Sequence, residues 1–170
     1  MGVNSKTVCQ INLVVNNLDQ LLANYRKAFP DLAVKIFNLP KPDAVPAFTD
    51  GKQGDYSDCR LAVLEFENLV LEITEPGASD SPWKRWLDAH GPGVEHIGFK
   101  ISEADKDETF KTLEGCGSKL YHAGFYPGGT YSFVDGFESF GFDFNIKWDA
   151  DNSERIAHWK THPQETLSKI

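Results

Sequence analysis

The order of the predicted elements occurs twice along the chain, and this internal repeat constrains the fold more than any other feature. Residues 7–75 and 94–148 each predict a strand, a helix and then three further strands. The first strands match in register, because Gln10 corresponds to His96 and the apolar residues after each alternate in the same way. We interpret this as duplication of a whole half. It predicts one domain with four parts: a first module at 1–76, a connector with a short helix at 77–92, a second module at 93–149 and a polar tail at 150–170.

In the first half, strict alternation of apolar and polar residues predicts a strand at 7–15. Asn17 is the predicted N-cap of the next helix, since Gln20 three residues later completes a pattern like a capping box. Pro30 ends this helix. The remaining strands of the half are predicted at 33–39, 59–67 and 68–75.

The segment PKPDAVPAFTDGKQGDYSD, residues 40–58, is rich in proline, glycine and aspartate and is predicted to be a long loop. Loops of this length are uncommon in compact domains unless they are functional. We therefore expect a lid over a substrate.

The second half follows a connector whose helix is predicted at about 81–89. A strand is expected over 94–101, and a helix is expected to begin near Glu103 with Ser102 as its N-cap. Three further strands are predicted at 118–125, 130–135 and 142–148.

The terminal strands of each half have one apolar face and one polar face, which places four polar side chains together. The apolar faces should carry the helices, and the opposite faces should form a cleft. Gln10, Glu72, His96 and Asn145 are expected to project into that cleft. The predicted fold class is therefore α+β: two tandem βαβββ modules form a curved mixed sheet that encloses the cleft, with the helices on the convex side.

Charge and composition exclude some partners. The chain has 170 residues and a formal net charge of −8, which opposes binding to nucleic acid or to anionic membranes. No apolar run approaches the roughly 20 residues that span a bilayer, and the first residues lack a signal-peptide core. The three cysteines are far apart, which favours a reducing compartment. We expect a cytoplasmic protein.

The stretch SPWKRWLDAHGPGVEHIGFKI, residues 81–101, carries a resemblance to a known family. Together with the duplicated pattern over residues 7–149, it resembles the vicinal oxygen chelate superfamily, which includes glyoxalase I, methylmalonyl-CoA epimerase, extradiol dioxygenases and bleomycin-resistance proteins. The stretch is most similar to the epimerase and glyoxalase-like branch, in which HGxGxHHIAF is typical. The resemblance also implies a small-molecule substrate and a homodimer.

The resemblance implies a metal site. In this family the ligands lie on the first, fourth, fifth and eighth strands, which here places them at Gln10, Glu72, His96 and Asn145. The family usually has a glutamate at the last position. An asparagine carries no charge and cannot act as a general base. The implied ion is a divalent metal (Zn, Ni, Co, Mn or Mg), bound more weakly than by two carboxylates.

Catalytic and pocket candidates follow from the same faces. Glu72 or Asp143 could serve as the base, and Asp143 would also restore a carboxylate if the last strand were shifted in register. The plainer alternatives are a buried, hydrogen-bonded His96 and a solvent-facing Glu72. The expected substrate pocket adds five residues: Asn12, Tyr56, His122, Tyr131 and Lys147.

Other aromatic and histidine pairs have plainer interpretations. Trp83 and Trp86 lie three residues apart on the connector helix and are predicted to pack rather than to stack on a ligand. His158 and His162 have a spacing that could suit a metal, but Pro163 and the polar surroundings favour a solvated tail.

Three functions remain open at this point. The first is a metal-dependent lyase or isomerase that acts on a small carbonyl or hydroxy-acid compound. The second is a metal-free protein that binds or sequesters small molecules, as bleomycin-resistance proteins do. The third is an extradiol-type dioxygenase, which Gln10 and Asn145 argue against because such enzymes need two histidines and a glutamate.

Overall fold

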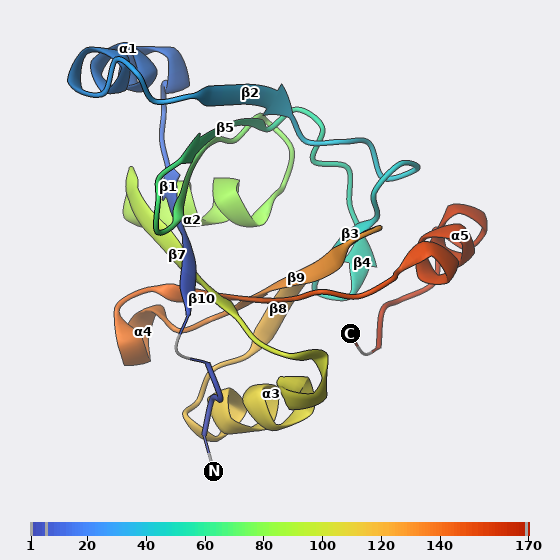
Figure 1. Cartoon of the computed structure of the whole chain (residues 1–170). Helices are drawn as coiled ribbons and strands as arrows, with labels where there is room; N and C mark the ends of the chain where they lie inside the picture. The colour runs from blue at the N-terminus through green and yellow to red at the C-terminus, as the bar shows by residue number, and fades with distance from the viewer. Residues whose placement is uncertain (1, 6, 169) are drawn as a thin grey trace.

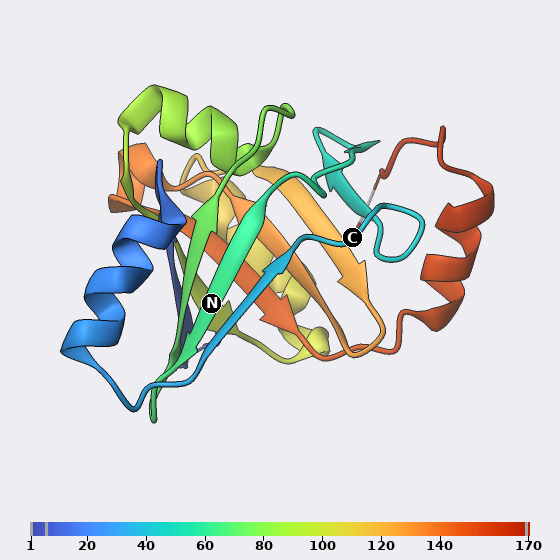
Figure 2. The same ribbon diagram turned by 90° about the horizontal axis from the view of Figure 1, so that it is seen from above.

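The computed structural model describes residues 2–5, 7–168 and 170. One mixed ten-stranded sheet runs through the molecule, with the strand order β2-β5-β6-β1-β7-β10-β9-β8-β3-β4. The sheet curves around a central space, and its two ends do not pair (Figures 1 and 2). The predicted fold class is confirmed.

The first module follows the predicted order. It contains β1 (Val8–Val14), α1 (Leu18–Ala28), β2 (Val34–Asn38), β5 (Arg60–Glu65) and β6 (Val70–Glu75). Asn17 caps α1 as expected, because its side chain accepts a hydrogen bond from the Gln20 backbone N–H. The buried Leu18 and Leu22 of α1 pack on the outer face of the sheet, against residues such as Ile73.

The second module repeats this arrangement. It contains β7 (Gly93–Lys100), a 3-10 turn (Glu103–Asp105), α3 (Lys106–Gly115), β8 (Leu120–Tyr126), β9 (Gly129–Val134) and β10 (Asp143–Trp148). Leu113 of α3 packs against Ile146 and Trp148 on the outer face. Two details differ from the prediction. Ser102 precedes the 3-10 turn rather than capping the α-helix, and a short helix, α4 (Phe137–Phe140), lies before β10.

The two modules join through their first strands, since β1 pairs antiparallel with β7. On either side, β6 runs parallel to β1 and β10 runs parallel to β7. This register aligns Glu72, Asn12, His96 and Asp143 across four strands. A neighbouring row aligns Gln10, Gly98 and Asn145. The duplication therefore brings polar residues from distant parts of the chain to the centre of the sheet.

The segment 40–58 is not the free lid that its composition predicts. It contains β3 (Ala47–Thr49) and β4 (Lys52–Gln53), and β3 pairs with β8 of the second module. Ala47 and Phe48 are buried. The chain of the first module therefore crosses over and extends the sheet of the second, which fixes this segment as a wall.

The connector helix α2 (Pro82–His90) corrects the expectation that all helices lie on the convex side. Its buried Trp83 and Trp86 pack on the inner side with Tyr56, Leu61 and Phe133. In Figure 1, α2 lies behind the space ringed by the strands, and Figure 2 shows it on the side away from the viewer of Figure 1. The helix therefore closes one end of the cleft.

The C-terminal segment carries α5 (Ser153–Thr161). The ring centroid of Trp159 lies 4.6 Å from that of Phe48 in an edge-to-face contact, so Trp159 holds this helix to the body. In the described part of the chain, no helix combines the length and the apolar character needed to cross a membrane.

Candidate functional site

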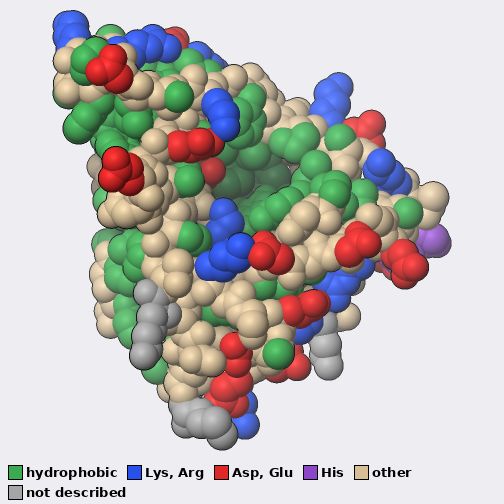
Figure 3. Space-filling view, in the orientation of Figure 1, with side chains coloured by type: hydrophobic (Ala, Val, Ile, Leu, Met, Phe, Trp, Pro, Cys, Tyr) green, Lys and Arg blue, Asp and Glu red, His purple; other side chains and the backbone are tan. Residues whose placement is uncertain are grey.

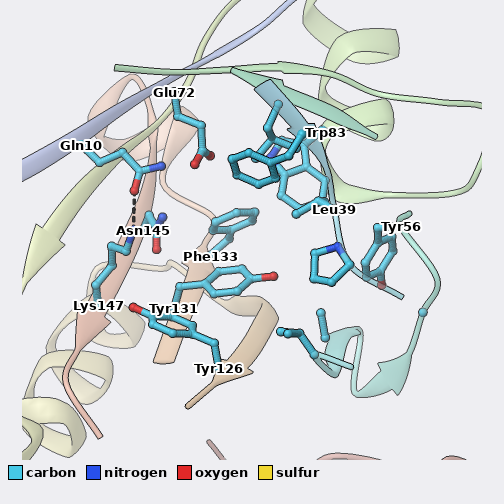
Figure 4. Close-up of a pocket in the computed structure, with 16 residues that line it drawn as sticks. Gln10, Leu39, Tyr56, Glu72, Trp83, Tyr126, Tyr131, Phe133, Asn145 and Lys147 are labelled. Carbon is cyan, nitrogen blue, oxygen red and sulfur yellow. Dashed lines mark hydrogen bonds between the residues drawn. The ribbon is translucent and has the colours of Figure 1, made fainter. Parts of the chain in front are cut away.

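A cavity of about 340 Å³ lies within the curve of the sheet. In Figure 3 it opens as a hollow lined mainly by hydrophobic side chains, with charged side chains at its rim. Figure 4 shows the residues that line it, with the polar groups gathered on one side and aromatic rings on the other. The lining residues are Gln10, Phe37, Leu39, Pro40, Val45, Ala47, Gly54, Tyr56, Leu61, Glu72, Trp83, Tyr126, Tyr131, Phe133, Asn145 and Lys147.

The aromatic wall is held by a buried chain of polar contacts. The Tyr56 hydroxyl lies 2.6 Å from Thr49 Oγ1, which in turn lies 2.8 Å from His122 Nδ1. His122 Nε2 lies 3.4 Å from the Tyr131 hydroxyl. Burial lowers the pKa of His122 from 6.5 to about 3, with smaller contributions from the nearby His96 and Arg85. His122 is therefore neutral near pH 7 and acts as a support behind the cavity wall.

Four polar residues form one end of the cavity, here called the polar end: Gln10, Glu72, Asn145 and Lys147. A lysine and an amide from opposite modules meet there. The Lys147 ammonium donates a hydrogen bond of 2.5 Å to Gln10 Oε1, which Figure 4 marks with a dashed line. Asn145 lies beside this pair in the same cavity wall. The polar end therefore carries a fixed positive charge.

Glu72 supplies the negative charge of the polar end. Its Oε1 accepts a hydrogen bond of 3.0 Å from the Asn12 side-chain amide, which also donates to Thr74 Oγ1 at 2.8 Å. Asn12 is fully buried, so it orients Glu72 from below. Among the described residues that line the cavity, Glu72 is the only carboxylate.

Gly98 keeps space for the polar end. It pairs with Gln10 on one side and with Asn145 on the other. A Cβ at this position would lie 2.7 Å from the Gln10 Cβ, closer than real carbon atoms approach. The glycine thus leaves room for the Gln10 side chain.

His96 lies beneath the polar end and is fully buried. Its Nε2 lies 3.1 Å from the Asn145 amide nitrogen and 3.4 Å from that of Gln10. Both neighbours are N–H donors, so Nε2 must be the acceptor and the proton sits on Nδ1. Nδ1 then donates to Glu95 Oε2 at 2.5 Å.

A β-bulge places Glu95 next to His96. Leu13 pairs with Val94 and Asn12 pairs with His96, so Glu95 is an extra residue in β7. Because of the bulge, the side chains of consecutive residues meet, and both are fully buried. The Tyr121 hydroxyl lies 3.4 Å from Glu95 Oε1 and donates to Asp143 Oδ2 at 2.8 Å, which extends the network.

The structure brings six of the predicted site residues to the cavity and leaves four outside it. Gln10, Glu72, Asn145, Tyr56, Tyr131 and Lys147 line the cavity. Asn12, His96, His122 and Asp143 are not among the lining residues. Asn12 and His122 support the wall from behind, and His96 supports the polar end.

Asp143, the second candidate base, is not among the residues that line the cavity. Its carboxylate accepts hydrogen bonds from the Gly136 and Phe137 backbone N–H groups, in addition to the one from Tyr121. Burial raises the pKa of Asp143, and these hydrogen bonds lower it in part. The side chain anchors the turn before β10 and borders a separate surface depression, so it is not placed to act as the base in the cavity.

The residues at the polar end do not fit a divalent metal as they are arranged. The amides of Gln10 and Asn145 turn their nitrogen atoms, not their oxygen atoms, toward the imidazole of His96. The Gln10 oxygen is held by the Lys147 ammonium. An ion bound to that oxygen would lie within about 4 Å of the ammonium, where repulsion between charges of +2 and +1 costs roughly 8 kcal/mol at an effective dielectric constant of about 20. Three groups favour a cation: the Glu72 carboxylate, and the buried Oδ1 atoms of Asn12 and Asn145, which have no hydrogen-bond partner among the described residues. They do not offset the ammonium that already holds the Gln10 oxygen.

Three parts of this site could not be found from the sequence. Trp83 was assigned to packing, yet it both packs and lines the cavity. Glu95 was assigned no role, because simple alternation places it on the helix side of β7 and no sequence signal marks the bulge. The aromatic lining from Phe37, Tyr126 and Phe133 was also missed, since it depends on how the sheet curves.

No curated protein matches this chain. Among solved structures, a methylmalonyl-CoA epimerase from Mycobacterium tuberculosis is similar at 15% identity, with a TM-score of 0.57 over 89% of this chain and 93% of that chain. A Streptomyces coelicolor methylmalonyl-CoA epimerase in complex with 2-nitronate-propionyl-CoA is similar at 18% identity, with a TM-score of 0.59 over 86% of this chain and 96% of that chain. A hypothetical protein from Bacillus halodurans reaches a TM-score of 0.58 at 16% identity over 85% and 95% of the two chains.

These structural neighbours share the fold of this chain, and their sequence identities are too low to assign a family or an activity. The family evidence comes from the sequence. A family model described as the Glyoxalase/Bleomycin resistance protein/Dioxygenase superfamily matches residues 9–134, which is well over half of the chain. The fold and this match agree with the resemblance found in the sequence, and the chain belongs to this superfamily.

Proposed function

We propose that the cavity binds a small oxygenated compound without a metal, and that Glu72 exchanges a proton on the carbon next to its carbonyl group. The observation that carries this proposal is the Lys147 ammonium, held at the polar end by Gln10. It supplies a positive charge at the place where the family resemblance implies a metal.

The shape of the cavity defines the ligand class. Six aromatic residues line it, and its volume of about 340 Å³ suits a compound with one ring. Such walls favour a flat apolar body, while an ammonium favours a carboxylate or a carbonyl oxygen. The expected ligand is an aromatic or branched apolar compound with an oxygen-bearing group at one end.

The two charged groups allow proton exchange at such a ligand. Glu72 would take a proton from the carbon beside the carbonyl, and the electron pair of that C–H bond would form the C=C bond of an enolate. The Lys147 ammonium would stabilise the developing negative charge on the oxygen. Return of the proton from Glu72 to carbon or to oxygen completes the cycle, so no oxidant or other reactant is needed.

A single carboxylate limits the chemistry to one face of the ligand. Asn145 cannot move a proton at neutral pH, and Asp143 does not line the cavity. Inversion at carbon by two bases on opposite faces is therefore disfavoured. The proposed isomerase chemistry is enolisation or tautomerisation, even though the named structural neighbours are epimerases.

Binding without chemistry is the second candidate, and the single carboxylate also favours it. The dioxygenase alternative gains no support, because His122 lies behind Tyr131 rather than at the polar end. A homodimer and a cytoplasmic location stay predictions.

The test uses phenylpyruvate, an aromatic 2-oxo acid, as the probe. Proton NMR in D2O should show that the wild-type chain accelerates the loss of its benzylic proton signal above the buffer rate. Glu72→Gln should bind phenylpyruvate but abolish the acceleration. Glu65→Gln, on the exposed part of β5, is the matched control and should behave as wild type.

The outcomes separate the two candidates. Binding of phenylpyruvate without any acceleration by the wild type would contradict proton exchange and leave the binding function. If neither phenylpyruvate nor its neutral analogue phenylacetone binds, the proposed ligand class is wrong.

A further inference from the structure

We infer that His158, His162 and Glu165 form a divalent-metal site on the surface of the C-terminal segment, separate from the cavity. The three side chains lie at the end of α5 and in the turn after it. One ligand atom from each lies within 4.8 Å of the others, which no other group of three His, Cys, Asp or Glu side chains achieves in the described residues. This inference does not depend on the function proposed for the cavity.

The helix brings the two histidines together. His158 and His162 are four residues apart, so their side chains lie on the same face, one turn apart. Their rings are nearly parallel, with centroids 4.4 Å apart and planes 11° apart. The same spacing of two histidines on a helix is used for zinc in known metal motifs.

The turn after the helix adds the carboxylate. The Glu165 backbone N–H donates to the His162 carbonyl oxygen at 3.2 Å, which folds the chain back toward the helix. Glu165 Oε2 then lies 3.0 Å from His158 Nε2. Pro163 lies within this turn, and its fixed φ limits the conformations that the segment can adopt.

His158 Nε2 donates to Glu165 Oε2, so a cation bound between them would replace that proton. The second histidine already has a free lone pair. His162 Nδ1 lies 3.1 Å from the His158 carbonyl oxygen, which can only accept, so Nδ1 carries the proton and Nε2 keeps its lone pair. Two imidazole nitrogens and one carboxylate oxygen suit Zn²⁺, Ni²⁺ or Co²⁺, with water completing the coordination. The His158 and Glu165 side chains are 47% and 54% exposed, so an ion can reach them without an opening of the fold.

A metal here would fix the chain that follows. The Leu167 backbone N–H donates to the Gly51 carbonyl oxygen at 2.7 Å, and its side chain packs on the cluster of Phe48 and Trp159. An ion held by α5 and Glu165 would therefore lock the C-terminal segment against the edge of the sheet near β3 and β4.

Calorimetric titration of the metal-free chain with Ni²⁺ tests this inference. Wild type should bind about one ion at this site. The double variant His158→Ala and His162→Ala should weaken the Kd by roughly tenfold or more. Glu165→Gln should weaken it less, and His90→Ala, an exposed histidine on α2, should leave it unchanged.

The location of the ion has its own readout. Paramagnetic Ni²⁺ should broaden or shift the amide NMR signals of residues 158–167 and leave those of Gln10 and Asn145 sharp. All the substituted side chains are exposed, so the variants should fold as wild type does. If the double variant binds Ni²⁺ as tightly as wild type, or if the signals of the cavity residues change instead, the inference is wrong.

Discussion

At the scale of single residues, the question that the sequence left open was whether His96 holds a metal. Its Nε2 faces two amide nitrogens, and its Nδ1 is bound to the buried Glu95. A carboxylate behind a histidine is typical of metal sites, but the cation at this polar end is Lys147. His96 therefore acts here by positioning Asn145 and Gln10.

The residues of the polar end could be predicted in part. Gln10, Glu72 and Asn145 were placed correctly, because alternation along a strand fixes which side chains share a face. The contact between Lys147 and Gln10 could not be predicted, since these residues are 137 positions apart in sequence. The position of Glu95 beside His96 could not be predicted either, because the β-bulge interrupts the alternation of side chains along β7.

A residue-scale prediction concerns His122 and pH. Its pKa is lowered from 6.5 in the unfolded chain to about 3 in the folded protein. Between these values the unfolded chain binds the additional proton, so the contribution of His122 to stability is present above pH 6.5 and is lost as the pH falls toward 3. Urea denaturation at a series of pH values below 6.5 checks this. As the pH is lowered, the free energy of unfolding of wild type should fall more steeply than that of His122→Asn, by up to about 1.4 kcal/mol per pH unit. Parallel profiles for the two proteins would contradict the assignment of a neutral, buried His122.

At the scale of elements, the strands and main helices were predicted well, and the connections between them were not. The periodicity of β1, α1, β7 and α3 is strong enough to identify each from sequence alone. The strands β3 and β4 are short and lie among prolines and glycines, so the local sequence predicts a loop there. Their pairing with β8 is a long-range contact that decides the structure of the segment.

The helix α2 contributes one tryptophan to the wall of the cavity. Trp83 both packs and lines the cavity, whereas Trp86 packs in the same cluster without lining it. Trp83→Ala should lower the free energy of unfolding by about 3–5 kcal/mol and should also weaken phenylpyruvate binding. Trp86→Ala should lower stability and leave binding nearly unchanged.

Urea denaturation and calorimetry together check this pair. Equal losses of affinity in both variants would show that α2 acts on the cavity only through stability. Unchanged affinity in Trp83→Ala would remove Trp83 from the binding wall.

At the scale of the whole molecule, the duplicated fold determines where a site can form. The two modules meet at β1 and β7, and each contributes side chains to one polar end: Gln10 and Glu72 from the first, Asn145 and Lys147 from the second. The sequence predicted this meeting place, because the repeat dictates it. It could not predict the curvature, the aromatic wall or the closure by α2, which depend on packing between distant elements.

We propose that the Lys147 ammonium, held by Gln10, takes the place of the metal ion that the family resemblance implies. Calorimetric titration of phenylpyruvate into chelator-treated protein tests this most directly. Wild type should bind without added metal, and Lys147→Met should bind more weakly by about 2 kcal/mol, the usual strength of a hydrogen bond to a charged group. Lys100→Met, an exposed lysine on β7, is the control and should bind as wild type does. If the chelator abolishes binding and a divalent ion restores it, or if Lys147→Met binds as tightly as wild type, Lys147 does not replace the metal ion.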